Sequence, residues 1–414
     1  HSKLERRAGV GGNPRFEPQR GGAVSVTYPQ GFRAGSVAAG LAARGGADLT
    51  VIVNDGPSLT AAAVFTSNRA KAHPIRWSMA AIDDHQVRAI VLNSGGANCF
   101  TGPEGFQLAH ASAERAAQAL SEQHALDVSA SDVLLCSTGL IGEPLPAGAV
   151  LQGIEVAVSA LDSSVEAGDE SARAIMTSDS QPKMVRHDGP GWKIGAIAKG
   201  AGMLAPGLAT MLVVITTDAV VDADLADSAL RAATAVSFDR LDSDGCMSTN
   251  DQVTLMASGA SGLQPTAEEF REVLTGVCVN LAQQLLRDAE GASHDIAIEV
   301  VGAASESDAV EVGRSVARSN LFKAAIFGQD PNWGRILAAM GTAKADFVVD
   351  QADVAINGVR VAAAGVPDRP RSEVDLSSRD VHIVIDLKAG AESATIWTND
   401  LTHDYVHENS AYSS

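Results

Sequence analysis

The segment that decides the fold reads KGAGMLAPGLAT at residues 199–210 and continues without a break as MLVVITT at residues 211–217. Glycine reaches backbone angles that are closed to other residues, and proline fixes its own φ and removes a donor. The first part therefore predicts a tightly turned loop. The β-branched, apolar run after it predicts a buried strand that fixes the end of the loop.

This junction delivers a hydroxyl, that of Thr210, at the first residue of the expected strand. The small side chain of Ala209 leaves the preceding carbonyl open to attack. Attack by the hydroxyl would shift the acyl group from nitrogen to oxygen, and hydrolysis of the ester would free an N-terminal threonine whose amine serves as its own base. Self-cleavage is one interpretation of the segment, and a glycine-rich turn before a core strand is the other.

Composition limits the class of protein. A chain of 414 residues, 45% hydrophobic and 20% charged, buries a large core and predicts two domains. A net charge of -19 argues against binding nucleic acid or an anionic membrane, which favours small-molecule chemistry. The four cysteines are widely spaced without a CxxC pair, so they indicate neither a zinc site nor a disulfide framework, and no metal is expected.

The chain start and its hydropathy bear on location. No stretch reaches the roughly 20 apolar residues that span a bilayer, and the charged start has no apolar run behind it to form a signal peptide. We therefore expect a cytoplasmic protein. Residues 1–22 are rich in Gly, Arg and Pro and lack periodicity, which predicts a disordered leader outside the fold.

From residue 31 the pattern alternates between strands and helices, which predicts an α/β (α+β) fold. Thr266 and Glu269 form a capping box before a long amphipathic helix that is expected to reach Gly291. Asn357-Gly358 predicts a type I′ hairpin. Expected strands lie at residues 49–53, 61–65, 89–92, 134–136, 211–217, 296–300, 381–387 and 394–398, the expected hairpin spans 354–361, and expected helices lie at 104–120, 222–233, 266–291 and from 305 onward.

Three polar segments lie at the ends of these predicted elements. An apolar strand opens into Thr138-Gly139, where consecutive backbone N–H groups beside a hydroxyl can form an oxyanion hole, although a plain turn has the same pattern. Glu290 is expected at the last turn of the long helix, where the helix dipole disfavours ionisation and suits a proton donor. The alternative is a solvated helix end. The loop at 242–251 starts like a calcium loop but lacks its later ligands.

Several ordered motifs resemble the ornithine acetyltransferase (glutamate N-acetyltransferase) family, the arginine-biosynthesis J proteins. Together they span the chain from about residue 30 to its end. The motifs are the self-processing signature at residues 199–212, NSGGAN at 93–98, CSTGLIG at 136–142, IMTSD at 175–179, DPNWGR at 330–335 and ENSAYSS at 408–414.

The resemblance implies a four-layer α/β/β/α sandwich of the DmpA/ArgJ-like type with a second, smaller α/β domain. Residues 23–291 would form the catalytic domain, residues 292–398 the second domain, and residues 399–414 a tail that returns to the active site. Cleavage between Ala209 and Thr210 would give chains 1–209 and 210–414, which would stay together as a heterotetramer of two α and two β chains.

The resemblance also implies a ping-pong reaction, in which Thr210 takes acetyl from N2-acetyl-L-ornithine and passes it to L-glutamate. Thr138 and Gly139 match the oxyanion pair. The substrate-contacting positions of the family match Thr177, Lys199, Thr210, Glu290, Asn409 and Ser414. An ammonium at Lys199 can pair with the α-carboxylate common to both substrates, whereas a solvated loop lysine is the alternative.

No cofactor is required by a transfer between two amino acids, and acetyl-CoA is possible as a co-substrate. Two rival hypotheses stay open at this point. A self-processing amidase or aminopeptidase of similar fold would keep the N-terminal threonine but pass the acyl group to water. A non-enzymatic binding protein would need neither cleavage nor an acyl-enzyme.

Overall fold

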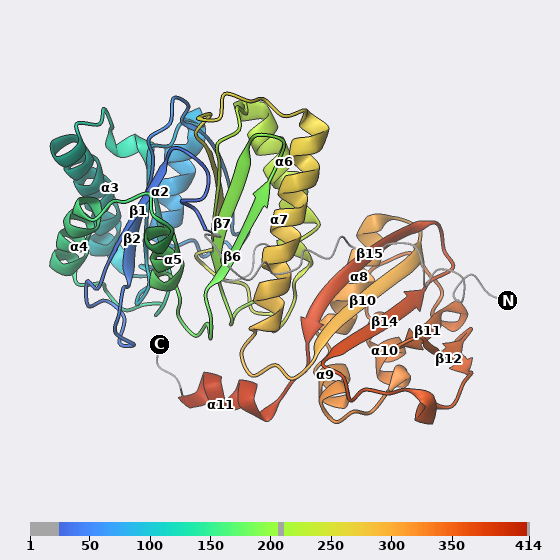
Figure 1. The fold of residues 1–414 in the computed structure, drawn as a ribbon. Helices are drawn as coiled ribbons and strands as arrows, with labels where there is room; N and C mark the ends of the chain where they lie inside the picture. The colour runs from blue at the N-terminus through green and yellow to red at the C-terminus, as the bar shows by residue number, and fades with distance from the viewer. Residues whose placement is uncertain (1–24, 206–210, 412–414) are drawn as a thin grey trace.

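The computed structural model describes residues 25–205 and 211–411. The expected leader at residues 1–22 lies outside these residues. The chain forms two α/β units, and the first has four layers in the order helix, sheet, sheet, helix, which run from left to right in Figure 1. This confirms the α/β/β/α sandwich.

The first sheet has its strands in the order β1-β2-β4-β5, and only β4 and β5 are parallel. Helices α3 and α4 cover its outer face and share one apolar core with it, while α2 packs on β5 and α5 on β1. The bounds are β1 (Phe32–Val37), β2 (Leu49–Asn54), β4 (Ala89–Asn93), β5 (Val133–Ser137), α2 (His73–Ala81), α3 (Gly102–His124), α4 (Ala147–Ser159) and α5 (Val165–Ala174).

The second sheet has the order β3-β9-β8-β7-β6, and α6 and α7 cover its outer face with a second core. The inner faces of the two sheets meet in a third core, to which strands of both sheets contribute. The bounds are β3 (Thr60–Phe65), β6 (Lys183–Asp188), β7 (Lys193–Lys199), β8 (Leu212–Thr217), β9 (Gln252–Ala257), α6 (Ala223–Ala235) and α7 (Ala267–Arg287).

Strand β8 is the predicted strand after the glycine-rich loop, and all of its residues are buried. It is covered on both faces, by the other sheet on one side and by α6 and α7 on the other, which explains why its sequence is apolar without alternation. Its neighbour β7 runs antiparallel, with Lys199 opposite Leu212. The loop between them therefore joins two adjacent antiparallel strands, and Lys199 belongs to a strand rather than to the loop.

The predicted strands at 49–53 and 61–65 are confirmed, and one helix boundary in the first unit needs correction. The two strands lie in different sheets, because the chain crosses from one sheet to the other after the Asn54 turn. Helix α7 begins as predicted, with the Thr266 hydroxyl accepting the Glu269 N–H, but it ends at Arg287 rather than at Gly291.

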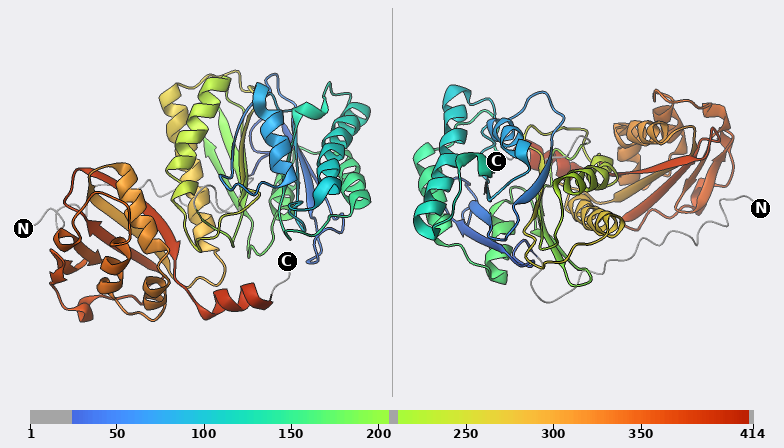
Figure 2. Two further views of the ribbon diagram at one scale, coloured as in Figure 1. Left: turned by 180° about the vertical axis from the view of Figure 1, so that it is seen from behind. Right: turned by 90° about the horizontal axis from the view of Figure 1, so that it is seen from above.

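The second unit holds a six-stranded sheet in the order β13-β12-β11-β14-β10-β15, with a separate core (Figure 2). Asn357 and Gly358 both have positive φ, as a type I′ hairpin requires. The predicted strands at 381–387 and 394–398 do not pair with each other, since β14 and β15 lie on opposite sides of β10. The bounds are β10 (Asp295–Ala303), β11 (Asp353–Ile356), β12 (Val359–Ala363), β13 (Val366–Pro367), β14 (Asp380–Asp386), β15 (Glu392–Asn399), α8 (Glu306–Ala317), α9 (Asn320–Phe327) and α10 (Trp333–Met340).

After β15 the chain turns back and forms helix α11 (His403–Ala411), which runs from the second unit beneath the first in Figure 1 and in the left view of Figure 2. Three cysteines are buried and Cys246 is exposed, all with free thiols. Among the described residues, no helix combines the length and the apolar character that crossing a membrane requires.

Candidate active site

A buried lysine connects two of the predicted site residues. Lys199, the last residue of β7, is 1% exposed, and its Nζ donates to Thr138 Oγ1 at 3.0 Å and to Thr177 Oγ1 at 2.7 Å. Thr138 follows β5 of the other sheet, and Thr177 follows helix α5. The site therefore forms where elements of both sheets end, and the solvated-lysine alternative is wrong.

The charge of Lys199 is strongly influenced by its surroundings. Burial lowers the pKa of Lys199, and the nearby Lys183 ammonium lowers it further. The carboxylates of Asp179, Asp251 and Glu290 act in the opposite direction, with Asp179 the strongest of the three. The result is an ammonium that releases its proton more readily than a lysine in water.

The structure reduces the number of donors at Thr138 and Gly139 that are available to an oxyanion. The Thr138 backbone N–H donates to Asn93 O at 3.0 Å, so it is not available to a ligand. The Thr138 hydroxyl accepts from Lys199, which leaves its own proton to donate. Gly139 has a φ of 129°, and a Cβ there would lie 2.5 Å from the Gly96 nitrogen. The candidate donors are thus one hydroxyl and the Gly139 N–H rather than two consecutive backbone groups.

Glu290 lies beyond the end of α7, so the expected helix-dipole effect at a last turn does not apply to it. Its backbone N–H donates to Ala201 O at 3.0 Å, which ties it to the glycine-rich loop. Its carboxylate accepts from Ser178 Oγ at 2.6 Å and from Asn409 Nδ2 at 2.8 Å. Tertiary contacts from three segments therefore hold this side chain.

Asn409 comes from helix α11, so part of the polar tail does return to the site. The tail is anchored at its start: Thr402 Oγ1 donates to Gly291 O at 2.6 Å, and a Cβ on Gly291 would lie 2.1 Å from the Tyr405 nitrogen. Further along, Tyr405 Oη donates to Asp244 Oδ2 at 3.3 Å. The helix is held close to the turn that carries Glu290.

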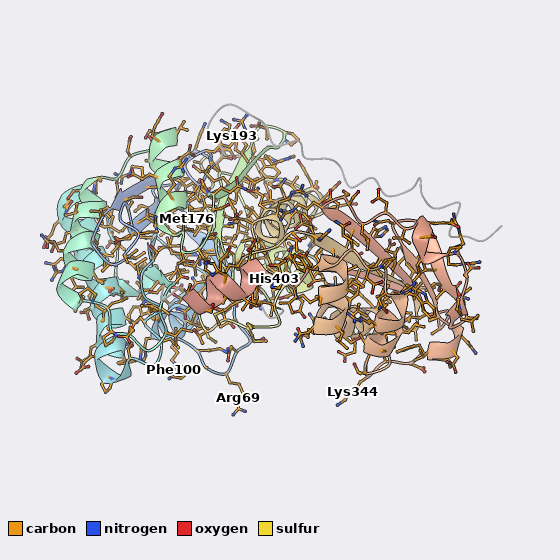
Figure 3. All side chains as sticks on the ribbon, turned by 90° about the horizontal axis from the view of Figure 1, so that it is seen from below. Arg69, Phe100, Met176, Lys193, Lys344 and His403 are labelled. Atoms are coloured by element: carbon orange, nitrogen blue, oxygen red, sulfur yellow. The ribbon has the colours of Figure 1, made fainter. Side chains whose placement is uncertain are left out.

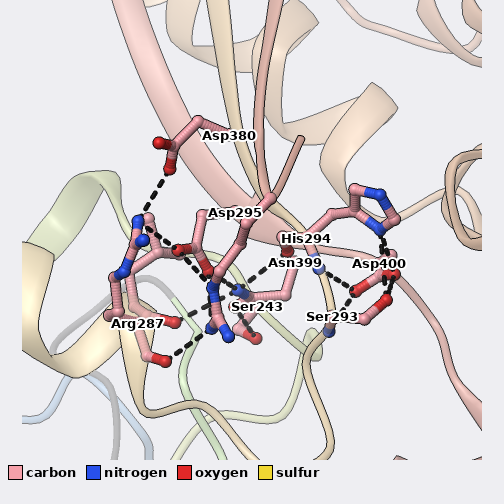
Figure 4. A network of polar contacts seen from close by, with 10 residues as sticks. Ser243, Arg287, Ser293, His294, Asp295, Asp380, Asn399 and Asp400 are labelled. Atoms are coloured by element: carbon pink, nitrogen blue, oxygen red, sulfur yellow. Dashed lines mark hydrogen bonds and ion pairs between the residues drawn. The ribbon is translucent and has the colours of Figure 1, made fainter. Parts of the chain in front are cut away.

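A buried polar network joins the end of α7, the start of β10 and the end of β15 (Figure 4). Asn399 donates to Leu286 O at 3.1 Å, to His294 O at 3.2 Å and to Asp295 Oδ1 at 2.9 Å. Asp400 accepts the Ser293 and His294 N–H groups, both at 2.9 Å. The network fixes the two segments that lead to Glu290 and to α11.

A cleft of about 490 Å³ opens beside Glu290, between the end of α7 and the start of α11. Figure 3 shows α11, which begins at His403, lying across this region of the molecule. The cleft gives small molecules a route to the Glu290 carboxylate. Its lining includes Ser178, Ser180, Arg287, Asp288, Glu290, Gly291, Phe327, Arg379, Thr402, His403, Asp404 and Glu408.

The structure brings together Thr138, Thr177 and Lys199, and separately Glu290 and Asn409. Three predicted site residues, Ala209, Thr210 and Ser414, lie outside the described residues. Within the described ranges, no group of three or more His, Cys, Asp or Glu side chains is placed to hold a metal ion.

Sequence reasoning missed several polar residues of this region. Ser178 and Asp179 stand in the quoted motif at 175–179, but only Thr177 was assigned a role. Asp251, the last residue of the polar loop, accepts the Met211 N–H at 3.1 Å, and its Oδ2 is buried without a hydrogen-bond partner among the described residues. Burial raises the pKa of Asp251 well above its ordinary value. No signal in the sequence pattern marked its burial.

Residues 33–414 match the family described as the ArgJ family. The chain is 58% identical over 391 residues to the "Arginine biosynthesis bifunctional protein ArgJ" of Streptomyces avermitilis, and 56% identical over 391 residues to the protein of the same name from Thermobifida fusca. Each alignment covers 94% of this chain and 100% of the relative.

One similar solved structure is the ornithine acetyltransferase of Mycobacterium tuberculosis complexed with ornithine. It is 46% identical in sequence, with a TM-score of 0.44, and the match covers 46% of this chain and 96% of that chain.

Proposed function

The chain belongs to the ArgJ family, and on that premise we propose that it transfers the acetyl group of N2-acetyl-L-ornithine to L-glutamate. Both relatives named above are called bifunctional proteins of arginine biosynthesis, and the sequence similarity extends over their whole length. The products are ornithine and N-acetylglutamate, so that the acetyl group is recycled within arginine precursor synthesis.

The observation that carries this proposal is the buried ammonium of Lys199 between Thr138 and Thr177. Two of its three N–H groups go to these hydroxyls among the described residues. The third can meet the α-carboxylate that N-acetylornithine and glutamate share. The Lys199 ammonium would thus hold each substrate in turn in position for the Thr210 hydroxyl.

In this proposal Thr210 is the nucleophile, and its freed amine takes the hydroxyl proton. The tetrahedral oxyanion is stabilised by the Thr138 hydroxyl and the Gly139 N–H. Glu290 supplies the proton that the departing ornithine amine needs. Its position next to the cleft supports this role.

Self-cleavage between Ala209 and Thr210 is part of the proposal, because only cleavage frees the amine of Thr210. The pairing of Lys199 with Leu212 holds the two ends of the loop in adjacent strands. The N–H of Met211, the residue after Thr210, is fixed by the buried Asp251. These contacts fix Lys199 and Met211, which lie before and after the proposed cleavage bond.

Other parts of the proposal follow from the family rather than from the described geometry. We propose that the two fragments stay together as a heterotetramer of two α and two β chains, that the protein acts in the cytoplasm, and that the transfer needs no cofactor. The relatives are bifunctional by name, so acetyl-CoA is the second acetyl donor to be assayed.

The test is an assay of purified protein with N2-acetylornithine, with and without glutamate. We expect N-acetylglutamate and ornithine when both are present, and one acetyl group on the peptide that begins at Thr210 when glutamate is absent. Free acetate formed at the same rate with and without glutamate would instead identify the amidase alternative. Acetyl-CoA with glutamate forms the second arm.

A further inference from the structure

The buried carboxylate of Asp179 contacts the segments that carry two of the proposed substrate-contacting residues, Thr177 and Lys199. Its side chain is fully buried, its Oδ2 accepts the Thr177 N–H at 3.0 Å, and its Oδ1 accepts the Gly200 N–H at 2.7 Å. Thr177 holds Lys199 through its hydroxyl, and Gly200 directly follows Lys199 in the chain. A single carboxylate therefore fixes the backbone on both sides of the Lys199 ammonium.

An ion-pair chain extends from this carboxylate to the Glu290 turn. The fully buried Lys183 donates from Nζ to Asp179 Oδ1 at 2.6 Å and to Asp288 Oδ2 at 2.5 Å. Asp288 directly follows α7, two positions before Glu290, and it also accepts the Ser180 N–H at 2.9 Å. The chain thus connects the segment that carries Thr177 with the segment that carries Glu290.

The buried triad of Asp179, Lys183 and Asp288 is costly in free energy, so stability alone does not explain its presence. Removing charges from water costs several kcal/mol for each ion, and well-packed apolar side chains of the same volume are often as stable. Burial alone would raise the pKa of Asp179, but Lys199 and Lys183, with the Gly200 N–H, hold it below its ordinary value. The group is therefore an anion whose directed bonds determine where its neighbours lie.

We propose that Asp179, Lys183 and Asp288 are positioning residues that hold the Lys199–Thr177 pair and the Glu290 turn in fixed relation to each other. The inference rests on the proposed function for the identity of the reaction. Acyl transfer needs the substrate carboxylate, the oxyanion donors and the proton donor aligned at once. A displacement of 1 Å in such an arrangement costs about 10²-fold in rate.

The experiment compares Asp179→Asn, Lys183→Met and Asp288→Asn with the matched control Asp353→Asn. Asp353 lies in the second unit and is buried, and it accepts from Lys388 Nζ and from the Ala364 N–H, with Arg360 as a further ion-pair partner at 3.9 Å. We expect kcat/KM to fall by about 10²-fold in Asp179→Asn and Lys183→Met, chiefly through KM for both amino acids. Asp288→Asn should act chiefly on kcat, and Asp353→Asn should lower Tm alone.

The pH profile separates positioning from a merely structural role. The charged groups that act on Lys199 are Asp179, Lys183, Asp251 and Glu290. Asp179→Asn removes an anion and should move the alkaline limb of kcat/KM to lower pH. Lys183→Met removes a cation and should move it to higher pH. Loss of stability by itself would not shift the alkaline limb in opposite directions in the two variants.

If Lys183→Met does not fold, Lys183→Arg takes its place. It keeps the charge, so it should fold and retain part of the activity. Equal loss of Tm in the site variants and the control, with kcat/KM and the alkaline limb unchanged, would overturn the inference. Self-cleavage provides a separate readout, because Asp179 also fixes Gly200 in the processing loop. A wild-type chain that cleaves itself but transfers no acetyl would defeat the proposed function alone, and slower cleavage of Asp179→Asn would still support the positioning role.

Discussion

The carboxylate of Glu290 occupies the space that a side chain at Gly202 would need. A Cβ at residue 202 would lie 2.4 Å from Glu290 Oε1 and 2.6 Å from its Oε2. Two glycines of the loop have different reasons to be glycine. Gly200 has a φ of 152°, which favours glycine, and Gly202 allows the backbone to approach the Glu290 carboxylate closely. Gly202 thus contributes to the placement of Glu290.

The first prediction concerns this contact. Gly202→Ala should displace the Glu290 side chain and lower acetyl transfer by about 10²-fold, since a small shift of a proton donor is costly. The control is Gly148→Ala in helix α4, where the added methyl group meets open space. It should leave kcat unchanged and add about 0.4–1 kcal/mol of stability. A folded Gly202→Ala variant with normal kcat would disprove the steric argument.

The second prediction concerns the carboxyl group itself. Glu290→Gln keeps the shape and one acceptor for Ser178 but cannot donate a proton as an acid does. Self-cleavage should proceed normally, while acetylation of the peptide beginning at Thr210 by N-acetylornithine should become slow. Glu272→Gln, on the exposed face of α7, is the control. Equal acetylation rates in wild type and Glu290→Gln would remove Glu290 from proton transfer.

The third prediction separates the Thr138 hydroxyl from its backbone. Because the Thr138 N–H is already bonded to Asn93, the hydroxyl is the group of Thr138 that can stabilise an oxyanion, beside the Gly139 N–H. Thr138→Ala should slow both self-cleavage and acetyl transfer by about 10² to 10³-fold, the effect of losing one donor. Thr138→Ser keeps the hydroxyl and should retain most of both activities. Single-turnover rates of each reaction provide the measurement, and a loss in Thr138→Ser as large as in Thr138→Ala would contradict this account.

The fourth prediction concerns pH. Burial lowers the pKa of Lys199, so as the pH rises its ammonium loses its proton earlier than an ordinary lysine does, and kcat/KM should fall over that pH range because substrate carboxylates lose their partner. The unfolded chain holds this proton to higher pH, so the contribution of Lys199 to the free energy of unfolding should rise with pH over the same range. Comparing wild type with Lys199→Met isolates both effects. A fall in kcat/KM that occurs only where the wild-type protein unfolds would contradict the assignment.

The fifth prediction concerns the nucleophile. Mass spectrometry of the purified protein should show two fragments in place of one 42.6 kDa chain, the second beginning at Thr210. Thr210→Ala should remain one chain and be inactive, because both cleavage and acyl transfer need the hydroxyl. Cleavage of Thr210→Ala at the same bond would show that another group attacks it.

Local patterns in the sequence determined the elements. The apolar run after Met211 predicted β8, the Thr266 cap predicted the start of α7, and Asn357-Gly358 predicted its hairpin, because capping, turn geometry and side-chain periodicity depend on residues close together in the chain. The family motifs, which are also short and ordered, indicated the reaction and most of the candidate residues.

Only the tertiary structure decided how these residues meet. Glu290 contacts Ala201, Ser178 and Asn409, which are 89, 112 and 119 positions away in the chain. The Thr138 N–H proved to be occupied, and Asp179 and Asp251 proved to be buried. Such contacts depend on which sheet each strand joins and on what the packed layers exclude from water. These are properties of the whole fold, and no local window of the sequence contains them.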